Sequence, residues 1–409
     1  MEDITIIPRP KKILYVGFNY NASYFMLGTD MGFQVHHSYP LTLKFSRNLN
    51  GGIGLVQILN KSNIFCLVGG GESPKYAPNK LLIWDDKQGK EIHEFRFSSF
   101  VTNCFIKLKY IFVFCKESIN IISMKTMKII KEIAIKNNPE GIGTISSDID
   151  KYILGWPSIS QGEIEIKDFQ ELKLNSQTIK IKAHNSEINC IKLNKDGTKL
   201  ASSSVNGTVI RVFNVINNQI IQEYKRGNGV AKIYSINFSN DSNIIAITSN
   251  HGTAHIFLIN SKENKNKEEG KSKSSTLDKK NDIINLINED KEDNENEIIL
   301  ENNKKVENFI NNENEKFEII NNELSNCELE DNSKKSIFSG VSQMIGLNNI
   351  FQKGYSYISF KISTKKESFI SFLNEDDNKV IVVDKLGNYT ISEFTMNKEV
   401  KIIKSDLLI

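Results

Sequence analysis

An internal repeat is the feature that most restricts how this chain can fold. The segment LNKDGTKLASSSVNGTVIRVF (193–213) aligns with FSNDSNIIAITSNHGTAHIF (238–257), and each copy reads as a polar turn, an apolar strand, a tight Gly-Thr turn and a second apolar strand. Four pairs of identical residues lie 45 positions apart: Asp196 and Asp241, Ala201 and Ala246, Gly207 and Gly252, Thr208 and Thr253. A period of about 40–45 residues made of short strands is typical of the blade of a β-propeller.

The rest of the chain fits the same pattern. Short β-rich runs such as KILYVGF (12–18), KLLIWD (80–85) and KYIFVFC (109–115) are bounded by Asn, Asp, Gly or Ser, and weaker copies of the repeat occupy 18–37 and 369–394. Outside one unusual insert, the chain is long enough for roughly seven units of this size. The sequence therefore predicts an all-β protein, a seven-bladed β-propeller with a long, largely disordered loop inside one blade.

The insert spans 261–335. It holds 13 lysines, 20 acidic residues and 17 asparagines, a local charge of −7 in a chain of 409 residues whose formal charge is +3. With few large apolar side chains it cannot bury a core, so we expect it to be disordered. The predicted organisation is propeller blades over 1–260, the acidic insert over 261–335, a separate apolar segment over 336–353, and closing blades over 354–409.

Several classes of protein are not expected. The sequence has no apolar run of 18 residues or more and no N-terminal signal pattern, which argues against a transmembrane helix and a secretory signal. The cysteines are odd in number with no CxxC pair, and the histidines form no metal-binding motif, so we expect reduced thiols, no metal and no cofactor. No catalytic motif stands out, so we predict no enzyme and no catalytic residue.

The sequence resembles the PROPPIN family, the seven-bladed WD-repeat propellers that bind phosphoinositides and act in autophagy. The similarity is strongest over 51–86, 183–213 and 224–257. The Phe-Arg-Arg-Gly turn that marks the family reads Tyr224-Lys225-Arg226-Gly227 here, so lysine replaces the first arginine. This turn lies on the connection between the two aligned repeats, and adjacent side chains on an extended segment point in opposite directions.

The resemblance implies two phosphoinositide pockets, one on each side of this turn, for phosphatidylinositol 3-phosphate and 3,5-bisphosphate. Hydroxyls, cations and a close backbone approach are what a phosphorylated inositol ring requires. The first pocket would contain His184, Ser202, Ser204, Gly207, Thr208, Arg211 and Lys225. The second would contain Arg226, Gly227, Ser249, Thr253 and His255.

Lys225 should weaken the first pocket without abolishing it, because lysine binds phosphate as a point charge and lacks the two-pronged geometry of arginine. A structural alternative stays open at this stage. Propeller turns favour His, Ser and Thr for local hydrogen bonds, so any one of these residues can instead belong to a network that closes a blade.

The segment 336–353 is the second predicted device for membrane contact. Its apolar residues recur at spacings of three and four, flanked by lysines, which suits an amphipathic helix at a membrane interface. They are Ile337, Phe338, Val341, Met344, Ile345, Leu347, Ile350 and Phe351. The alternative is a helix packed on its own propeller. The resemblance favours the membrane, because PROPPINs have a membrane-inserting loop in the same place.

We therefore predict a peripheral membrane effector that binds phosphoinositides and recruits autophagy proteins such as lipid-transfer or conjugation machinery. We expect a monomer in solution and a cytoplasmic protein on pre-autophagosomal, endosomal or vacuolar membranes, or on a lineage-specific organelle such as a plastid. The alternative is a propeller scaffold that binds only proteins, in which case deletion of 336–353 should leave localisation unchanged. Nucleic acid is not an expected partner, since no platform of basic and aromatic residues stands out.

Overall fold

The protein is described from a computed structural model, which covers residues 12–170, 177–259, 353–354, 356–362, 365–373, 376–395 and 397–408. All of these belong to one compact unit formed by 1–261 and 351–409. They form strands and connecting turns without a helix, and the strands make seven separate sheets. The predicted acidic insert (261–335) and all the residues predicted to contact a membrane lie outside the described residues.

The first four sheets are each built from four consecutive antiparallel strands. Blade 1 contains β1 (Ile13–Phe18), β2 (Tyr24–Thr29), β3 (Gly32–His37) and β4 (Thr42–Asn48). Blade 2 contains β5 (Ile53–Ile58), β6 (Ile64–Gly69), β7 (Lys80–Asp85) and β8 (Lys90–Arg96). Blade 3 contains β9 (Val101–Ile106), β10 (Tyr110–Cys115), β11 (Ser118–Ser123) and β12 (Lys128–Ala134). Blade 4 contains β13 (Thr144–Ile145), β14 (Ile153–Pro157), β15 (Glu163–Asp168) and β16 (Ile179–Lys182).

The last three sheets include the repeat and both sides of the insert. Blade 5 contains β17 (Ile188–Leu193), β18 (Lys199–Ser204), β19 (Val209–Asn214) and β20 (Ile220–Lys225), with β24 (Lys353–Gly354) added in parallel at its edge. Blade 6 contains β21 (Ile233–Phe238), β22 (Ile244–Ser249), β23 (Thr253–Leu258) and β25 (Ile358–Lys361). Blade 7 contains β26 (Ser368–Leu373), β27 (Asp376–Asp384), β28 (Asn388–Phe394) and β29 (Val400–Leu407).

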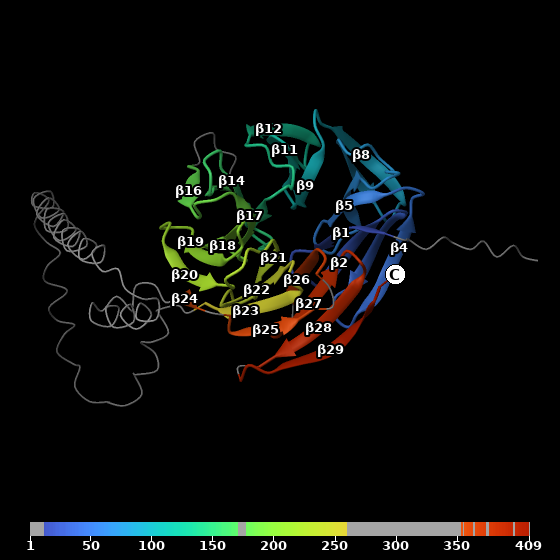
Figure 1. Cartoon of the computed structure of the whole chain (residues 1–409). Coiled ribbons are helices and arrows are strands. Elements are labelled where there is room, and N and C mark those ends of the chain that lie inside the picture. Colours follow the sequence, from blue (N-terminus) through green and yellow to red (C-terminus); the bar gives the residue numbers. More distant parts are fainter. Residues whose placement is uncertain are drawn as a thin grey trace, which may run out of the picture. The chain divides into compact units, whose positions relative to one another are not determined.

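Figure 1 shows the seven sheets arranged around a common centre, with β1, β5, β9, β17, β21 and β26 closest to it. The all-β, seven-bladed propeller predicted from the repeat is confirmed. The Gly207 and Gly252 turns have positive φ angles of 57° and 69°, as expected for the tight turn of each repeat. The second and third strands of most blades are almost wholly buried. Outer strands such as β4 and β12 consist of exposed and partly buried residues.

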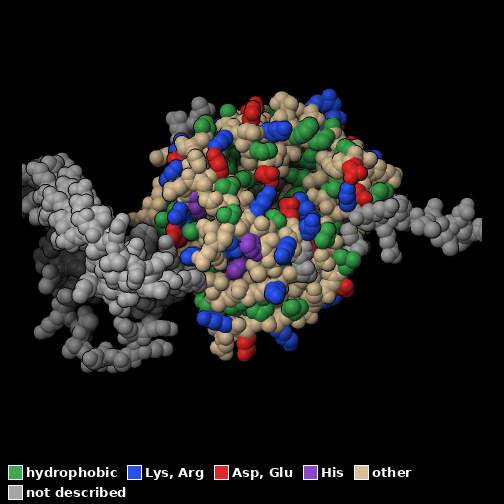
Figure 2. All heavy atoms as spheres, viewed as in Figure 1, with side chains coloured by type: hydrophobic (Ala, Val, Ile, Leu, Met, Phe, Trp, Pro, Cys, Tyr) green, Lys and Arg blue, Asp and Glu red, His purple; other side chains and the backbone are tan. Residues whose placement is uncertain are grey.

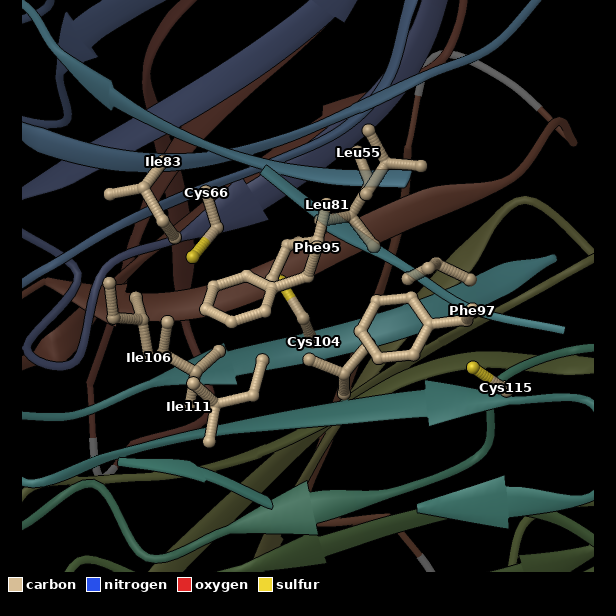
Figure 3. Close-up of a cluster of buried hydrophobic side chains, with 14 of the residues drawn as sticks. Leu55, Cys66, Leu81, Ile83, Phe95, Phe97, Cys104, Ile106, Ile111 and Cys115 are labelled. Carbon is tan, nitrogen blue, oxygen red and sulfur yellow. The ribbon is translucent and has the colours of Figure 1, made fainter. Parts of the chain in front are cut away.

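Each junction between neighbouring blades has its own apolar cluster, and these clusters hold the ring together. Between blades 2 and 3, Leu81, Phe95 and Cys104 pack in one such cluster (Figure 3). Between blades 7 and 1, Phe25 and Leu27 pack against Ile381. Because blades 1 and 7 exchange no strand among the described residues, side-chain packing is the contact seen to close the ring at this junction.

The repeats place the predicted turn between blades 5 and 6. Strands β23 and β25 pair antiparallel in blade 6, with Thr253 opposite Lys361 and His255 opposite Ser359. The chain between these two strands therefore leaves and re-enters the same blade. Before re-entry, β24 pairs with the outer strand of blade 5, at Glu223 and Tyr224.

Candidate binding site between blades 5 and 6

The Tyr224-Lys225-Arg226-Gly227 turn begins at the end of β20 and starts the connection to β21. The ring of Tyr224 is 2 % exposed, and its hydroxyl donates a hydrogen bond to the carbonyl oxygen of Leu258 at 2.6 Å. The same ring packs on Phe257 at 4.7 Å between centroids. Both contacts reach blade 6, so the first residue of the turn fastens the outer strand of blade 5 to its neighbour.

Lys225 is the cation that stays available. Its side chain is half-buried beside Val209 of β19, and within the described part of the chain its ammonium group has no hydrogen bond or ion pair. An ammonium with three free donors at a rim is suited to an anionic group.

Arg226 is held by backbone oxygens on both sides of it. Its Nε donates to the carbonyl oxygen of Gly207 at 2.8 Å, and its Nη2 donates to that of Gly229 at 2.6 Å. Its backbone nitrogen donates to Thr208 at 2.9 Å. Burial lowers the pKa of Arg226, although a guanidinium keeps its charge at neutral pH. Arg226 therefore ties the connection to the turn of blade 5 and brings a fixed positive charge there.

In blade 5, three predicted residues are already engaged with protein groups. His184 Nε2 and Ser202 Oγ, both buried, form a hydrogen bond of 2.9 Å. Arg211 binds Glu223 at 2.8 Å and the carbonyl oxygen of Ala183 at 2.6 Å. Burial, reinforced by the charge of Arg211, lowers the pKa of His184 to about 4. These contacts favour the structural alternative for His184, Ser202 and Arg211, whereas Ser204, Gly207 and Thr208 lie at the turn itself.

In blade 6, two of the predicted residues have a buried polar atom without a hydrogen-bond partner among the described residues. The hydroxyl of Thr253 and Nε2 of His255 form a hydrogen bond of 3.0 Å. Among the described residues, His255 Nδ1 and Ser249 Oγ are buried without a partner. Burial lowers the pKa of His255 to about 4, helped by the nearby charges of Arg226 and His251. Buried polar atoms without partners are costly, and these two lie in the blade whose His255 is acted on by the charge of Arg226.

Other buried hydroxyls in the described part of the chain also lack a partner, so Ser249 by itself is not unusual. They belong to Ser38, Ser203, Ser368 and Ser392. What distinguishes blade 6 is that Ser249 lies opposite Thr253, that Thr253 contacts His255, and that the charge of Arg226 acts on His255.

Sequence reasoning missed Lys361. It is exposed on β25 directly opposite Thr253, so it adds a second cation to the blade 6 group. Its strand follows the insert, far from the rest of blade 6 in the sequence. The sequence could have indicated Lys361, because blade 6 has three strands before the insert and needs a fourth. The strand-like ISFKI segment after the insert, which contains Lys361, supplies that strand.

The strand register shows which residues of blades 5 and 6 occupy equivalent positions, and it differs from the 45-residue spacing of the sequence. Arg211 lies opposite Ser202 in blade 5, and His255 lies opposite Ile247 in blade 6. Ser202 and Ile247 each lie two residues before the end of their strands, at Ser204 and Ser249, so Arg211 and His255 occupy equivalent positions in the two sheets. The 45-residue spacing does not align them, because the turn of blade 5 is one residue longer than that of blade 6. The position carries an arginine neutralised by Glu223 in one blade and a neutral histidine in the other.

The face of the molecule seen in Figure 2 does not carry a single basic patch. Figure 2 shows Lys, Arg, Asp and Glu side chains interspersed over one face of the molecule. A cavity of about 560 Å³ is lined by inner-strand residues such as Gln57, Lys192 and Asn237, and it includes none of the predicted site residues. Within the described ranges, no group of three His, Cys, Asp or Glu side chains is placed to hold a metal ion, and no helix would span a bilayer.

The fold and this turn define a seven-bladed β-propeller with a basic connection between blades 5 and 6. A sequence model of the PROPPIN family matches residues 17–285, and the chain belongs to that family. It is 33% identical over 61% of its length to SVP1-like protein 2 of Saccharomyces cerevisiae, and 33% identical over 61% to autophagy-related protein 18e of Arabidopsis thaliana. It spans 63% and 66% of the lengths of these two relatives, slightly less than two thirds.

Solved structures show the same fold. Hsv2 of Kluyveromyces lactis superposes with a TM-score of 0.67, covering 97% of this chain and 99% of that one at 17% identity. At this identity the likeness concerns the arrangement of blades.

Proposed function

We propose that this chain is a peripheral membrane protein that binds phosphatidylinositol 3-phosphate, and also the 3,5-bisphosphate, at the junction of blades 5 and 6. The observation that carries the proposal is the pairing of two features. Among the described residues, the ammonium group of Lys225 has no partner and lies next to the fixed charge of Arg226 in the chain, and Ser249 Oγ and His255 Nδ1 are buried without a partner. A phosphate monoester would supply the acceptors that these groups lack.

The chemistry differs on the two sides of the turn. On the blade 6 side, Lys361, Ser249 and Thr253 offer a cation and hydroxyls to one phosphorylated ring, and the charge of Arg226, which is held at the blade 5 turn, acts on His255 of the same blade. A phosphate near His255 would favour its protonated form and so add a donor. On the blade 5 side, Lys225 is the available cation because Arg211 is paired with Glu223. We therefore expect the blade 6 side to bind more tightly.

The cellular setting is part of the same proposal. The name of one relative, autophagy-related protein 18e, supports a role in autophagy. We propose that the chain recruits autophagy proteins to the membrane that it binds. Binding rather than catalysis is the expected activity. The segment 336–353 remains a predicted additional contact with the membrane, and several weak contacts to one surface would add up through multivalency.

A vesicle co-sedimentation panel tests the proposal. The full chain is mixed with phosphatidylcholine vesicles that contain either phosphatidylinositol or one of its phosphorylated forms. We expect binding to vesicles with the 3-phosphate and the 3,5-bisphosphate, and loss of that binding in Lys225→Ala/Arg226→Ala. The matched control is Lys87→Ala/Lys90→Ala, which removes two exposed lysines from blade 2.

Because Arg226 also holds the turn, thermal unfolding of each variant must accompany the panel, and Lys225→Glu serves as a variant that breaks no hydrogen bond of the described residues. Equal binding to phosphorylated and unphosphorylated lipid, unchanged by Lys225→Glu, would contradict the proposal. It would favour a propeller scaffold that binds only proteins.

A further inference from the structure

Two valines are exposed on neighbouring turns beside the basic connection. Val230, on the connection from β20 to β21, is 69% exposed, and Val205, on the turn from β18 to β19, is 47% exposed. The two turns are joined by a hydrogen bond of 3.0 Å from the backbone nitrogen of Ala231 to the carbonyl oxygen of Asn206. Each valine is thus one residue away from a shared contact.

The backbone around Val230 is held in place by both blades. The carbonyl oxygen of Val230 accepts a hydrogen bond from His251 Nε2 at 3.1 Å. Two residues further on, the backbone nitrogen of Lys232 donates a hydrogen bond to Asn250 Oδ1 at 3.1 Å. On the other side, Arg226 donates to the carbonyl oxygen of Gly229. Since the loop is fixed at both ends, the Val230 side chain is held in solvent and gains nothing from burial in the folded chain.

The valines share their rim with cations. Lys225 and Arg226 precede Val230 by five and four positions, and the turn that carries Val205 also supplies the Gly207 oxygen that Arg226 binds. Apolar side chains flanked by Lys and Arg are suited to the boundary between lipid headgroups and acyl chains, where the cations meet phosphate and the apolar groups leave water.

We infer that Val205 and Val230 form a second apolar contact with the bilayer, entering its interfacial region while a headgroup occupies the adjacent site. This inference rests on the proposed function and adds to it a surface on the propeller itself, distinct from the segment 336–353. A lipid surface fits better than a folded protein, because stable protein interfaces bury about 1,200 Å² or more in total and two valines supply a small part of that.

The test separates membrane contact from headgroup recognition. The full chain and its Val205→Ser/Val230→Ser variant are compared for binding to phosphatidylcholine vesicles containing phosphatidylinositol 3-phosphate, and for binding to soluble inositol 1,3-bisphosphate. The control is Ile216→Ser, because Ile216 is 77% exposed on the turn between β19 and β20, at the end of β19 remote from Lys225. Val230→Leu is included as a variant that keeps and enlarges the apolar group.

We expect the double variant to bind vesicles about tenfold more weakly while binding the soluble headgroup as the unmodified chain does. Ile216→Ser should bind both normally, and Val230→Leu should bind vesicles at least as tightly. Unchanged vesicle binding by the double variant would overturn the inference, and so would an equal loss for vesicles and headgroup, which would make the valines structural. If the unmodified chain binds neither probe, the proposed function itself fails, and the inference fails with it.

Discussion

The guanidinium Nε of Arg226 donates a hydrogen bond of 2.8 Å to the carbonyl oxygen of Gly207, so the connection between blades 5 and 6 is fastened to the tight turn of blade 5. The backbone nitrogen of Arg226 binds Thr208, the next residue of the same turn. The connection that carries the cations is therefore joined to the Gly207 turn by a side-chain and a backbone hydrogen bond of Arg226. Changes to the Gly207 turn should affect how the cations are presented.

Gly207→Ala should destabilise the protein and weaken phosphoinositide binding together. Gly207 has a φ angle of 57°, and an added Cβ would lie 1.8 Å from the carbonyl oxygen of Ala231. We expect a loss of about 3 kcal/mol in the free energy of unfolding, from the left-handed backbone and the forced shift of the connection. Chemical denaturation measures this directly.

Gly89→Ala is the matched control for that change. Gly89 has a similar φ angle of 64°, but nothing lies within 4 Å of an added Cβ. It should cost only about 1 kcal/mol and leave lipid binding intact. Equal losses in the two variants would mean that the contact between the Gly207 turn and the connection has no energetic importance.

Ser249→Ala and Ser202→Ala should have opposite effects on stability. Ser249 Oγ is buried without a partner in the described chain, so its removal should be neutral or stabilise the fold by up to about 1 kcal/mol, while weakening headgroup binding. Ser202 Oγ binds His184, so its removal should cost about 1–3 kcal/mol. Melting temperature and headgroup affinity, measured on both variants, check this. A strongly destabilised Ser249→Ala variant would argue against a headgroup-binding role for Ser249.

Lys225→Arg should strengthen binding without changing stability. The lysine ammonium makes no hydrogen bond or ion pair with the described residues, so the fold does not depend on it. A guanidinium can contact two phosphate oxygens at once, which we expect to improve vesicle affinity about fivefold, or roughly 1 kcal/mol. An arginine variant that binds as the natural chain does would indicate that the blade 5 side takes no phosphate. Lys195→Arg, at an exposed lysine of the same blade, controls for a general effect of arginine.

Most of the fold was predictable from the sequence. The 45-residue repeat and its glycine turns led directly to the blades, because Gly207 and Gly252 mark the same turn in two consecutive sheets. The fourth strand of blade 6 was harder to predict, since it follows the insert and only its pairing with β23 identifies it. The addition of β24 to blade 5 has no signal in the sequence, because backbone hydrogen bonds alone define a two-residue strand.

The position of the candidate turn in the fold was predictable from the sequence, whereas the contacts of the candidate side chains were not. The turn at Lys225 and Arg226 could be found from the repeat boundaries and from the resemblance to PROPPINs. Whether a given polar side chain is free or engaged depends on partners distant in sequence. Arg211 forms an ion pair with Glu223 because their strands pair, and Lys361 lies opposite Thr253 for the same reason. Sequence spacing alone does not reveal such cross-strand neighbours.

Stability should fall as the pH falls from about 6.5 to about 4. Burial lowers the pKa of His36, His184 and His255 to about 4, from an ordinary value of 6.5. In that window the unfolded chain binds protons that the folded chain does not, so acid favours unfolding, by about 1 kcal/mol for each histidine at pH 5.5. Denaturation curves at several pH values measure the slope. A His36→Gln/His184→Gln variant should show a flatter dependence, and an unchanged slope would contradict this explanation.

The most direct test of the central claim is calorimetric titration of the full chain with soluble inositol 1,3-bisphosphate, the headgroup of phosphatidylinositol 3-phosphate, without any membrane. We predict saturable binding that is lost in Lys225→Glu/Arg226→Glu and retained in Lys87→Glu/Lys90→Glu, where the same charge change is made on blade 2. Absence of headgroup binding by the folded natural chain, or equal binding by the two variants, would contradict the assignment of a phosphoinositide site to the junction of blades 5 and 6.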